Sequence, residues 1–335
     1  MATHDPESRL QALLASGEAT IAEQFFAALL VVQNSIDLDA LAVLLEQGRL
    51  DEAFRVVGRA AAQLGTSWSD VYTHAGRDTA RFMNREMADL VISFDQTNAR
   101  AVRVMQENQL RLVREFTEAQ RRATNQAMLR GMQEGLNPRA QARAFRDSIG
   151  LTQTQERWVD NYRRNLSELD SRALGRELRD RRFDRTVRRA IDDGKPLSQA
   201  KIDKMVERYR ERMLKYRSEV IARTEALKAT HQGVGEMYDQ AIEAGELDPR
   251  QLIAIWNTAG DERVRDFSTG AQTSHASMHN QERMHGEPFT SGAGNTAMFP
   301  GTFGIAMEDI QCRCVRSMRI LTPAEAGITV QVIGT

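Results

Sequence analysis

A change of residue pattern near Pro249 constrains the fold of this chain more than any other feature. Before it, apolar residues recur at three- and four-residue helical steps, whereas the segments 251–258 and 314–320 after it read as strands. Gly, Ser, Thr and Asn crowd residues 268–304 between these two segments. We therefore expect an α+β fold, in which long helical N-terminal and middle regions precede a small C-terminal α+β module.

Turn and capping residues suggest where the helices begin and end. Gly48 is a plausible stop for an early helix, and one long helix is expected from Asn84 to Arg130, because no Gly or Pro interrupts that stretch. Asn137-Pro138 is typical of an N-cap followed by the first helical position, and Gly150 closes that helix. A capping box at Thr152 and Gln155 begins the next helix. This next helix is expected to bury Trp158 and Tyr162.

The C-terminal module is expected to open with a long helix from Gln199 to Ala244, after a break at residues 193–196. A short helix is expected near His275 to Met284. The final strand should pair beside the strand that contains Trp256, and the long helix should cover one face of this sheet, because so small a sheet is unstable alone.

Domain boundaries follow from these breaks and from charge. We expect a helical N-terminal region at 1–136, a helical linker region at 137–195, and the C-terminal module at 196–335. The net charge is −1, yet residues 98–147 carry ten Arg against five acids. Such asymmetry suggests different partners for different parts of the chain.

The two cysteines, Cys312 and Cys314, are too close in sequence to form a disulfide framework, which favours a reducing cytoplasm. The first residues do not resemble a signal peptide. The apolar run from Phe25 to Val32 is far shorter than the ~20 residues that span a bilayer, so no membrane partner is expected.

A metal site is one interpretation of the His and Cys residues of the module. His275 and His279 at helical spacing would face one side, and the thiolates of Cys312 and Cys314 could complete a tetrahedral zinc site. Two small buried thiols packed as hydrophobes explain the Cys-x-Cys spacing equally well.

Charged residues of the module suggest a structural polar network. Arg223 and Glu225 lie on the long helix, and Asp261, Arg263 and Arg265 lie in a turn after the Trp256 strand. Arg–carboxylate pairs could fix the helix against the sheet. The alternative is a polar active site that includes His275.

Several enzyme classes lack support in this sequence. It has no phosphate-binding loop with Lys, and no serine nucleophile elbow. An Arg-Thr-Glu triplet at 223–225 is not followed by the Glu-x-Glu or Gln-x-Glu that an ADP-ribosyltransferase would need.

The order and spacing of several motifs resemble the C-terminal module of the Mu-F-like family of phage minor head, or head morphogenesis, proteins. The resemblance covers roughly Arg223 to Arg319, with weaker similarity from about Asn137. The motifs that carry it are Ala222-Arg223-Thr224-Glu225, Trp256, Asp261-Glu262-Arg263-Val264-Arg265, His275, Phe299-Pro300-Gly301 and Gln311-Cys312-Arg313-Cys314.

The resemblance implies a minor structural head protein of a tailed phage, made in the host cytoplasm and carried in the virion. Its role would be capsid assembly at the portal vertex, genome ejection, or both. The alternative is a metal-dependent or transferase-type enzyme domain carried on a phage head anchor.

Two expectations concern partners. The apolar stripe at Phe25, Phe26, Leu29 and Leu30 is wide for a surface helix, so it should dock on another helix, the portal or the major capsid protein. Arg-rich helices at 100–146 and 172–189 could contact DNA phosphates weakly and without sequence preference, although a solvated charged face is the ordinary explanation.

Overall fold

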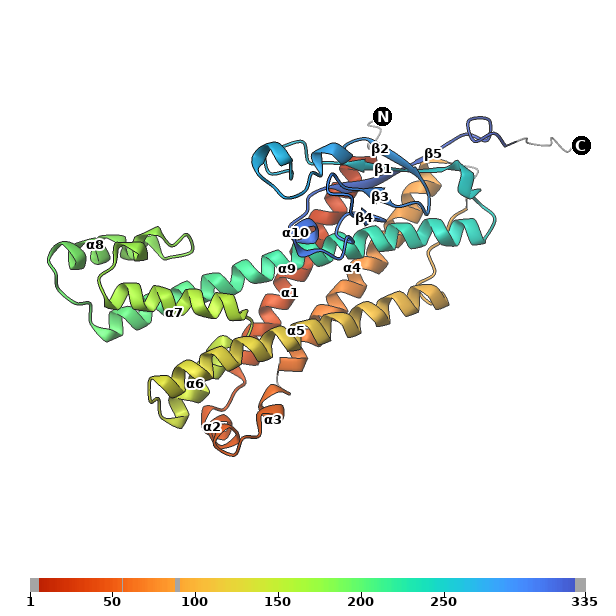
Figure 1. The fold of residues 1–335 in the computed structure, drawn as a ribbon. Helices are drawn as coiled ribbons and strands as arrows, with labels where there is room; N and C mark the ends of the chain where they lie inside the picture. Colours follow the sequence, from red (N-terminus) through yellow and green to blue (C-terminus); the bar gives the residue numbers. More distant parts are fainter. Residues whose placement is uncertain (1–5, 56, 88–90, 329–335) are drawn as a thin grey trace, which may run out of the picture. The chain divides into compact units, whose positions relative to one another are not determined.

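The computed structural model of the chain describes residues 6–55, 57–87 and 91–328, and it is mostly helical (Figure 1). The helices are α1 (Pro6–Asn34), α2 (Leu38–Glu46), α3 (Leu50–Phe54), α4 (Val57–Glu86), α5 (Ala99–Gln133), α6 (Pro138–Ser148), α7 (Gln153–Ser167), α8 (Asp184–Asp192), α9 (Gln199–Glu243) and α10 (Ala306–Asp309). The strands are β1 (Leu252–Asn257), β2 (Gln281–Met284), β3 (Phe289–Thr290), β4 (Thr296–Ala297) and β5 (Val315–Ile320). The predicted α+β class, with sheet confined to the C-terminal part of the described residues, is confirmed.

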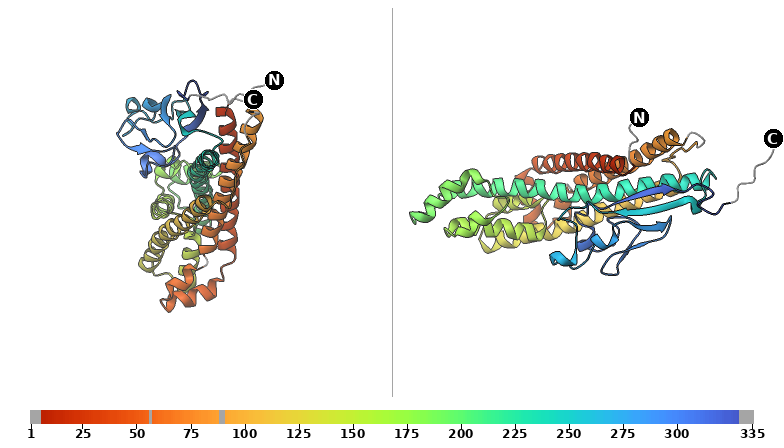
Figure 2. Two further views of the ribbon diagram at one scale, coloured as in Figure 1. Left: turned by 90° about the vertical axis from the view of Figure 1, so that its right-hand side faces the viewer. Right: turned by 90° about the horizontal axis from the view of Figure 1, so that it is seen from above.

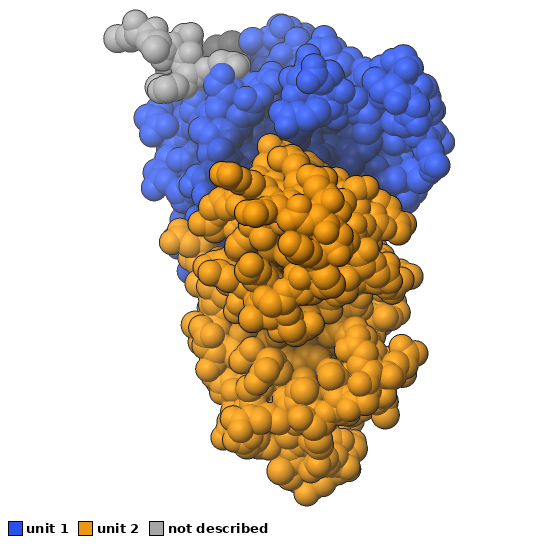
Figure 3. Space-filling view, turned by 90° about the vertical axis from the view of Figure 1, so that its left-hand side faces the viewer, with its two compact units in different colours: residues 1–22, 66–109, 220–335 blue, residues 23–65, 110–219 orange. Residues whose placement is uncertain are grey.

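The chain forms two compact units that interleave along the sequence (Figure 3). Unit 1 comprises residues 1–22, 66–109 and 220–335, and unit 2 comprises residues 23–65 and 110–219. The sequence-based division into three consecutive regions does not anticipate this interleaving. Helices α1, α4, α5 and α9 each contribute residues to both units.

Aromatic pairs mark the core of unit 2. Phe25 meets Phe116 edge to face with ring centroids 5.2 Å apart, and the rings of Tyr162 and Tyr209 lie 4.6 Å apart. Tyr162 is buried as predicted, but Trp158 is 41% exposed, so the prediction for Trp158 was wrong. The buried face of α7 follows Val159, Tyr162 and Leu166, and the helical period places Trp158 beside that face rather than on it.

The predicted caps in unit 2 are confirmed. The side chain of Asn137 accepts a hydrogen bond from the backbone N–H of Ala140, and Thr152 and Gln155 make both bonds of a capping box. Gly150 has a φ of +89°, a left-handed conformation that favours glycine. A Cβ at this position would lie 2.2 Å from Leu214 Cδ1, so the Leu214 side chain would have to move.

The predicted helix from Asn84 to Arg130 is wrong, because α4 ends at Glu86 and α5 begins at Ala99. Residues 88–90, which that helix also covered, lie outside the described residues. The Asn84 side chain bonds both backbone groups of Ile92, and the Gln240 side chain bonds both backbone groups of Asp95. Side chains thus satisfy the backbone where a helix would have done so, without any Gly or Pro.

Strands β2, β1 and β5 form an antiparallel sheet in unit 1, in that order. The predicted strands at 251–258 and 314–320 and their pairing are confirmed, with Trp256 opposite Arg316. The short helix expected at 275–284 is wrong: a single 3₁₀ turn at Ala276–Met278 is followed by β2. Asn280, at φ +63°, donates its backbone N–H to Trp256 O and so directs the chain into the sheet.

The C-terminal half of α9 packs against this sheet, as predicted (Figures 1 and 2). Its apolar face packs with the sheet in two hydrophobic cores. The first core lies toward the end of α9, and in the second, nearer the middle of α9, Leu227 packs with Ala254 and Trp256. The first core contains Val234, Met237, Tyr238 and Ala241 of α9 together with Leu252 and Val315. Leu10 and Leu14 of α1 also pack in this unit, so the start of the chain completes the core of the C-terminal module.

One described helix segment, Glu7–Asn34 within α1, is long and apolar enough by length and composition to cross a membrane. Part of its apolar surface packs inside the protein in this structure, since Ile21, Phe25 and Leu29 are buried.

We predict that Gly233→Ala destabilises unit 1. A Cβ at Gly233 of α9 would lie 2.1 Å from the backbone oxygen of Tyr72 in α4, so the two helices would have to separate. The expected loss is about 1–3 kcal/mol of unfolding free energy, measured by thermal or denaturant unfolding. Gly58→Ala, in a helix with open space around the added Cβ, is the control and should not destabilise. Equal effects of both changes would contradict the close approach.

Candidate metal centre

His275, Cys312 and Cys314 lie together in the interior of unit 1. His275 stands just before the 3₁₀ turn at Ala276–Met278, and the two cysteines lie in the segment that leads into β5. Their exposed fractions are 1%, 1% and 3%. Nδ1 of His275 lies 3.6 Å from Sγ of Cys312 and 3.6 Å from Sγ of Cys314. Antiparallel pairing of β5 beside β1 delivers the cysteines here, next to Trp256.

These separations match a tetrahedral zinc site. With Zn–S bonds of about 2.3 Å and Zn–N bonds of about 2.0 Å, the nitrogen–sulfur edge of a tetrahedron is about 3.5 Å. The three ligand atoms all lie within 4.8 Å of one another. The donor set of two thiolates and one imidazole also suits zinc better than calcium or magnesium, which prefer oxygen ligands.

Glu308 lies at the far nitrogen of His275. Its Oε2 is 3.5 Å from His275 Nε2, and among the described residues both buried atoms lack a hydrogen bond. Its Oε1 accepts hydrogen bonds from Ser291 Oγ at 3.1 Å and from Asn295 Nδ2 at 2.7 Å. A carboxyl group on the far nitrogen of a metal-binding histidine fixes the tautomer and the ring orientation. Here a proton on Nε2 would leave the Nδ1 lone pair facing both sulfurs.

The two thiols also influence each other. Hydrogen bonding with Cys314, followed by that with His275, holds the pKa of Cys312 well below its usual range. The same contact with Cys312, together with burial, raises the pKa of Cys314. One thiolate is therefore favoured even without a cation, and a cation would favour the second by its charge.

Apolar rings enclose the cluster. The ring of Phe303 stacks on that of His275 at 5.3 Å, and the ring of Trp256 meets it edge to face at 6.0 Å. Phe289 and Met278 belong to the same buried core. An apolar environment of this kind suits a structural metal site, since water has little access to the ligands.

His279 does not join the cluster. It is exposed, and its Nδ1 lies 3.2 Å from the backbone nitrogen of Thr258, which donates to it. The expected pairing of His275 and His279 required an α-helix, but the chain extends after the 3₁₀ turn, so the two rings point to different places.

The predicted polar network is divided between two places. Arg223 makes a bidentate pair with Glu18 of α1, with the closest contact at 2.8 Å, and therefore does not bond the 261–265 turn. Asp261 instead pairs with Arg313, whose contacts hold the pKa of Asp261 at about 2. Arg263 pairs with Asp261 and Glu225 pairs with Lys228, both nearby in sequence. Arg265 donates to the backbone oxygen of Ile310, 45 positions away.

Sequence reasoning missed Glu308 and Glu18. A single Glu in a short helix carries no spacing signature, so only its position four residues before Cys312 hinted at a role. Glu18 lies 205 positions from Arg223, and nothing local connects them.

Comparisons with protein-family models, with curated proteins and with solved structures found no match to this chain.

We predict that the chain purified under reducing conditions with zinc binds one zinc ion, measured by elemental mass spectrometry. Cys312→Ser and Cys314→Ser should lose the ion and lower the melting temperature, because free zinc at 1,000 times its dissociation constant adds about 4 kcal/mol to stability. His279→Ala is the control and should keep both. Zinc-free protein with unchanged melting in all variants would leave only a packing role.

We further predict that Glu308→Gln keeps the ion but binds it roughly 10–100-fold more weakly, as found for outer-shell partners elsewhere. A competition titration against a chromophoric chelator measures this. Unchanged affinity would show that Glu308 does not orient His275.

Proposed function

We propose that this protein is a minor structural component of a tailed-phage head, which acts in capsid assembly at the portal vertex, in genome ejection, or in both. The observation that supports the proposal is the convergence of the motif residues behind the family resemblance. Trp256, His275, Cys312 and Cys314 come from separate segments and meet in one buried core, against Leu227 of α9. Their proximity supports the interpretation that these motifs belong to one folded module.

Within this proposal, the metal centre stabilises the module. Its ligands are almost completely buried, and none of them lines the cavity between β5 and the helices α1 and α4 of unit 1. A catalytic zinc keeps an open position for water or substrate. The alternative, a metal-dependent or transferase-type enzyme, draws support from the count of three protein ligands, which leaves a fourth position to be filled.

We propose that α1 carries the contact to the portal or the major capsid protein, on a smaller surface than the sequence suggested. Phe25 and Leu29 are buried inside unit 2, with Phe25 against Phe116. Leu30 and Val31 are 37% and 66% exposed. The exposed pair, together with the half-buried Phe26, is the surface available to a partner.

Weak DNA contact through the Arg-rich helices is a further part of the proposal. Several of the arginines counted in the sequence are paired with carboxylates in the structure. Arg121 pairs with Asp51, Arg182 with Asp180, and Arg188 with Asp184. Phosphates would therefore compete with these carboxylates, which reduces the expected affinity.

Proteomics of purified virions and of empty procapsids tests the structural role. We expect the protein in both at low copy number, or in virions alone if it enters with the genome. Its absence from both particles, combined with catalytic turnover by the zinc-loaded protein, would favour the enzyme alternative.

The docking surface is tested by a Leu30→Glu/Val31→Glu double variant. We expect it to fold normally, because both side chains reach solvent, but to be depleted from heads by tenfold or more in quantitative proteomics. Val91→Glu, at a 79% exposed position between α4 and α5, is the matched control and should be incorporated normally. Normal incorporation of the double variant would exclude this surface. Deleting residues 1–60 would be a poor test, because Leu10 and Leu14 belong to the core of unit 1.

A further inference from the structure

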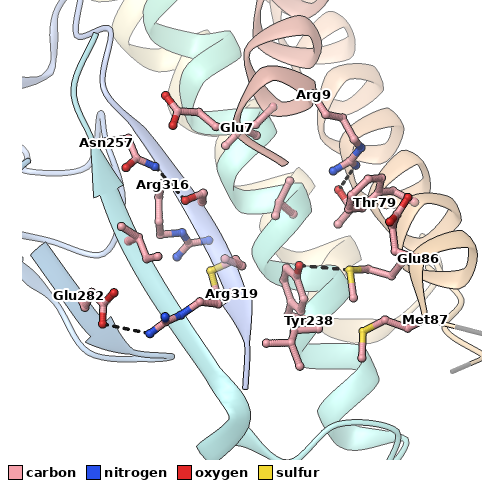
Figure 4. A pocket seen from close by; sticks show the side chains of 18 of the residues that line it. Glu7, Arg9, Thr79, Glu86, Met87, Tyr238, Asn257, Glu282, Arg316 and Arg319 are labelled. Atoms are coloured by element: carbon pink, nitrogen blue, oxygen red, sulfur yellow. Dashed lines mark hydrogen bonds and ion pairs between the residues drawn. The ribbon is translucent and has the colours of Figure 1, made fainter. Parts of the chain in front are cut away.

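A cavity of about 770 Å³ lies in unit 1, away from the metal ligands (Figure 4). One wall is β5 from Arg316 to Ile320, with Ile255 and Asn257 of β1 beside it. Helices α1 and α4 form the opposite wall, and α9 contributes Val234 and Tyr238. Cavities of roughly 300–1,000 Å³ with mainly apolar walls and a few polar groups are typical of small-molecule sites.

About half of the lining residues are apolar, and the rest are polar or charged, including the carboxylates of Glu7, Glu86 and Glu282. The side chains that could contact an aliphatic chain are Leu10, Phe82, Met83, Met87, Met318 and Ile320. Three of these are methionines, whose unbranched side chains adapt to ligands of different shape.

Arg316 is the unusual polar group of this cavity. It is 5% exposed, and its guanidinium donates to the backbone oxygens of His231 at 3.2 Å and Met298 at 3.3 Å. Its Nε is buried without a hydrogen-bond partner. Among the described residues, no carboxylate oxygen lies within 4.0 Å of its nitrogens. A buried charge without an opposite charge is costly, so the site is incomplete as it stands.

The carboxylate that attracts Arg316 already has another partner. Asp239 attracts Arg316 from a distance, but it is engaged with Nε2 of His285 at 2.6 Å. The Arg316 guanidinium carries a positive charge at neutral pH, as arginine does throughout proteins. Tyr238 has only a weak contact of its hydroxyl with Met83 Sδ at 3.6 Å and can donate to a ligand.

The remaining cations of the cavity are already satisfied. Arg9 donates to Asp78 at 3.0 Å and to Thr79, and Arg319 pairs with Glu282 at 3.3 Å. Figure 4 shows the Arg319–Glu282 pair on the strand side of the cavity and the Arg9–Thr79 bond on the helix side. The position next to Arg316 and Tyr238 is therefore where an anion would gain most.

We propose that this cavity binds a small amphipathic carboxylate, with its carboxylate on Arg316 Nε and the Tyr238 hydroxyl and its aliphatic chain among the methionines and Phe82. The opposite charge compensates the buried guanidinium, and the chain removes apolar surface from water. This site is independent of the phage-head proposal and of the metal centre.

Calorimetric titration of the full chain with decanoate and with its neutral methyl ester tests the proposal. We expect saturable binding of decanoate at one site, about tenfold or more tighter than the ester, because only the acid can form charged hydrogen bonds. Arg316→Met should reduce decanoate binding to the level of the ester. Arg319→Met, the same change at a paired and exposed arginine of the same cavity, is the matched control and should bind like the original protein.

Removing Arg316 also removes its bonds to His231 and Met298, so each variant is first checked by thermal unfolding. If Arg316→Met does not fold, Tyr238→Phe serves instead, with an expected severalfold loss for decanoate and none for the ester. Equal binding of acid and ester, absence of saturable binding, or an equal loss in Arg319→Met would each overturn the proposal.

Discussion

The packing of α9 onto the β2-β1-β5 sheet is the interaction on which the rest of unit 1 depends. A three-stranded sheet does not hide enough apolar surface to be stable alone. The face of α9 that carries Leu227, Val234 and Tyr238 covers it, and Gly233 lets the other side of the same helix approach α4. Losing this packing would expose the core around Trp256 and the metal ligands together.

The segment from Cys312 to Ile320 concentrates the chemistry of the module. Alternate positions along it carry Cys312, Cys314 and Arg316, followed by Met318 and Ile320. Cys312, Cys314 and Arg316 are buried, and Met318 and Ile320 are partly buried against the core of unit 1. The start of this segment therefore serves the metal cluster, and its end, from Arg316 to Ile320, lines the cavity.

The sequence predicted those features that depend on neighbouring residues. The caps at Asn137 and Thr152 are local hydrogen-bond arrangements, and the two strands around the Gly-rich loops differ clearly from the helices. Pairing those strands was enough to bring Cys312 and Cys314 near Trp256. The break after α4 was missed because the Gln240 side chain, far along the chain, satisfies the Asp95 backbone. Glu308 and Glu18 were missed for the same reason: their partners are set by tertiary structure.

The interleaving of the two units has a consequence for the order in which the protein can fold during synthesis. Leu10 and Leu14 leave the ribosome more than 200 residues before their partners on α9 and the sheet. Unit 2 lies entirely within residues 23–219, so its segments are complete while the start of α1 still lacks its core. Domains form as their segments emerge, and exposed apolar surface invites association meanwhile. The nascent chain must therefore keep an apolar helix start soluble until the C-terminal strands arrive.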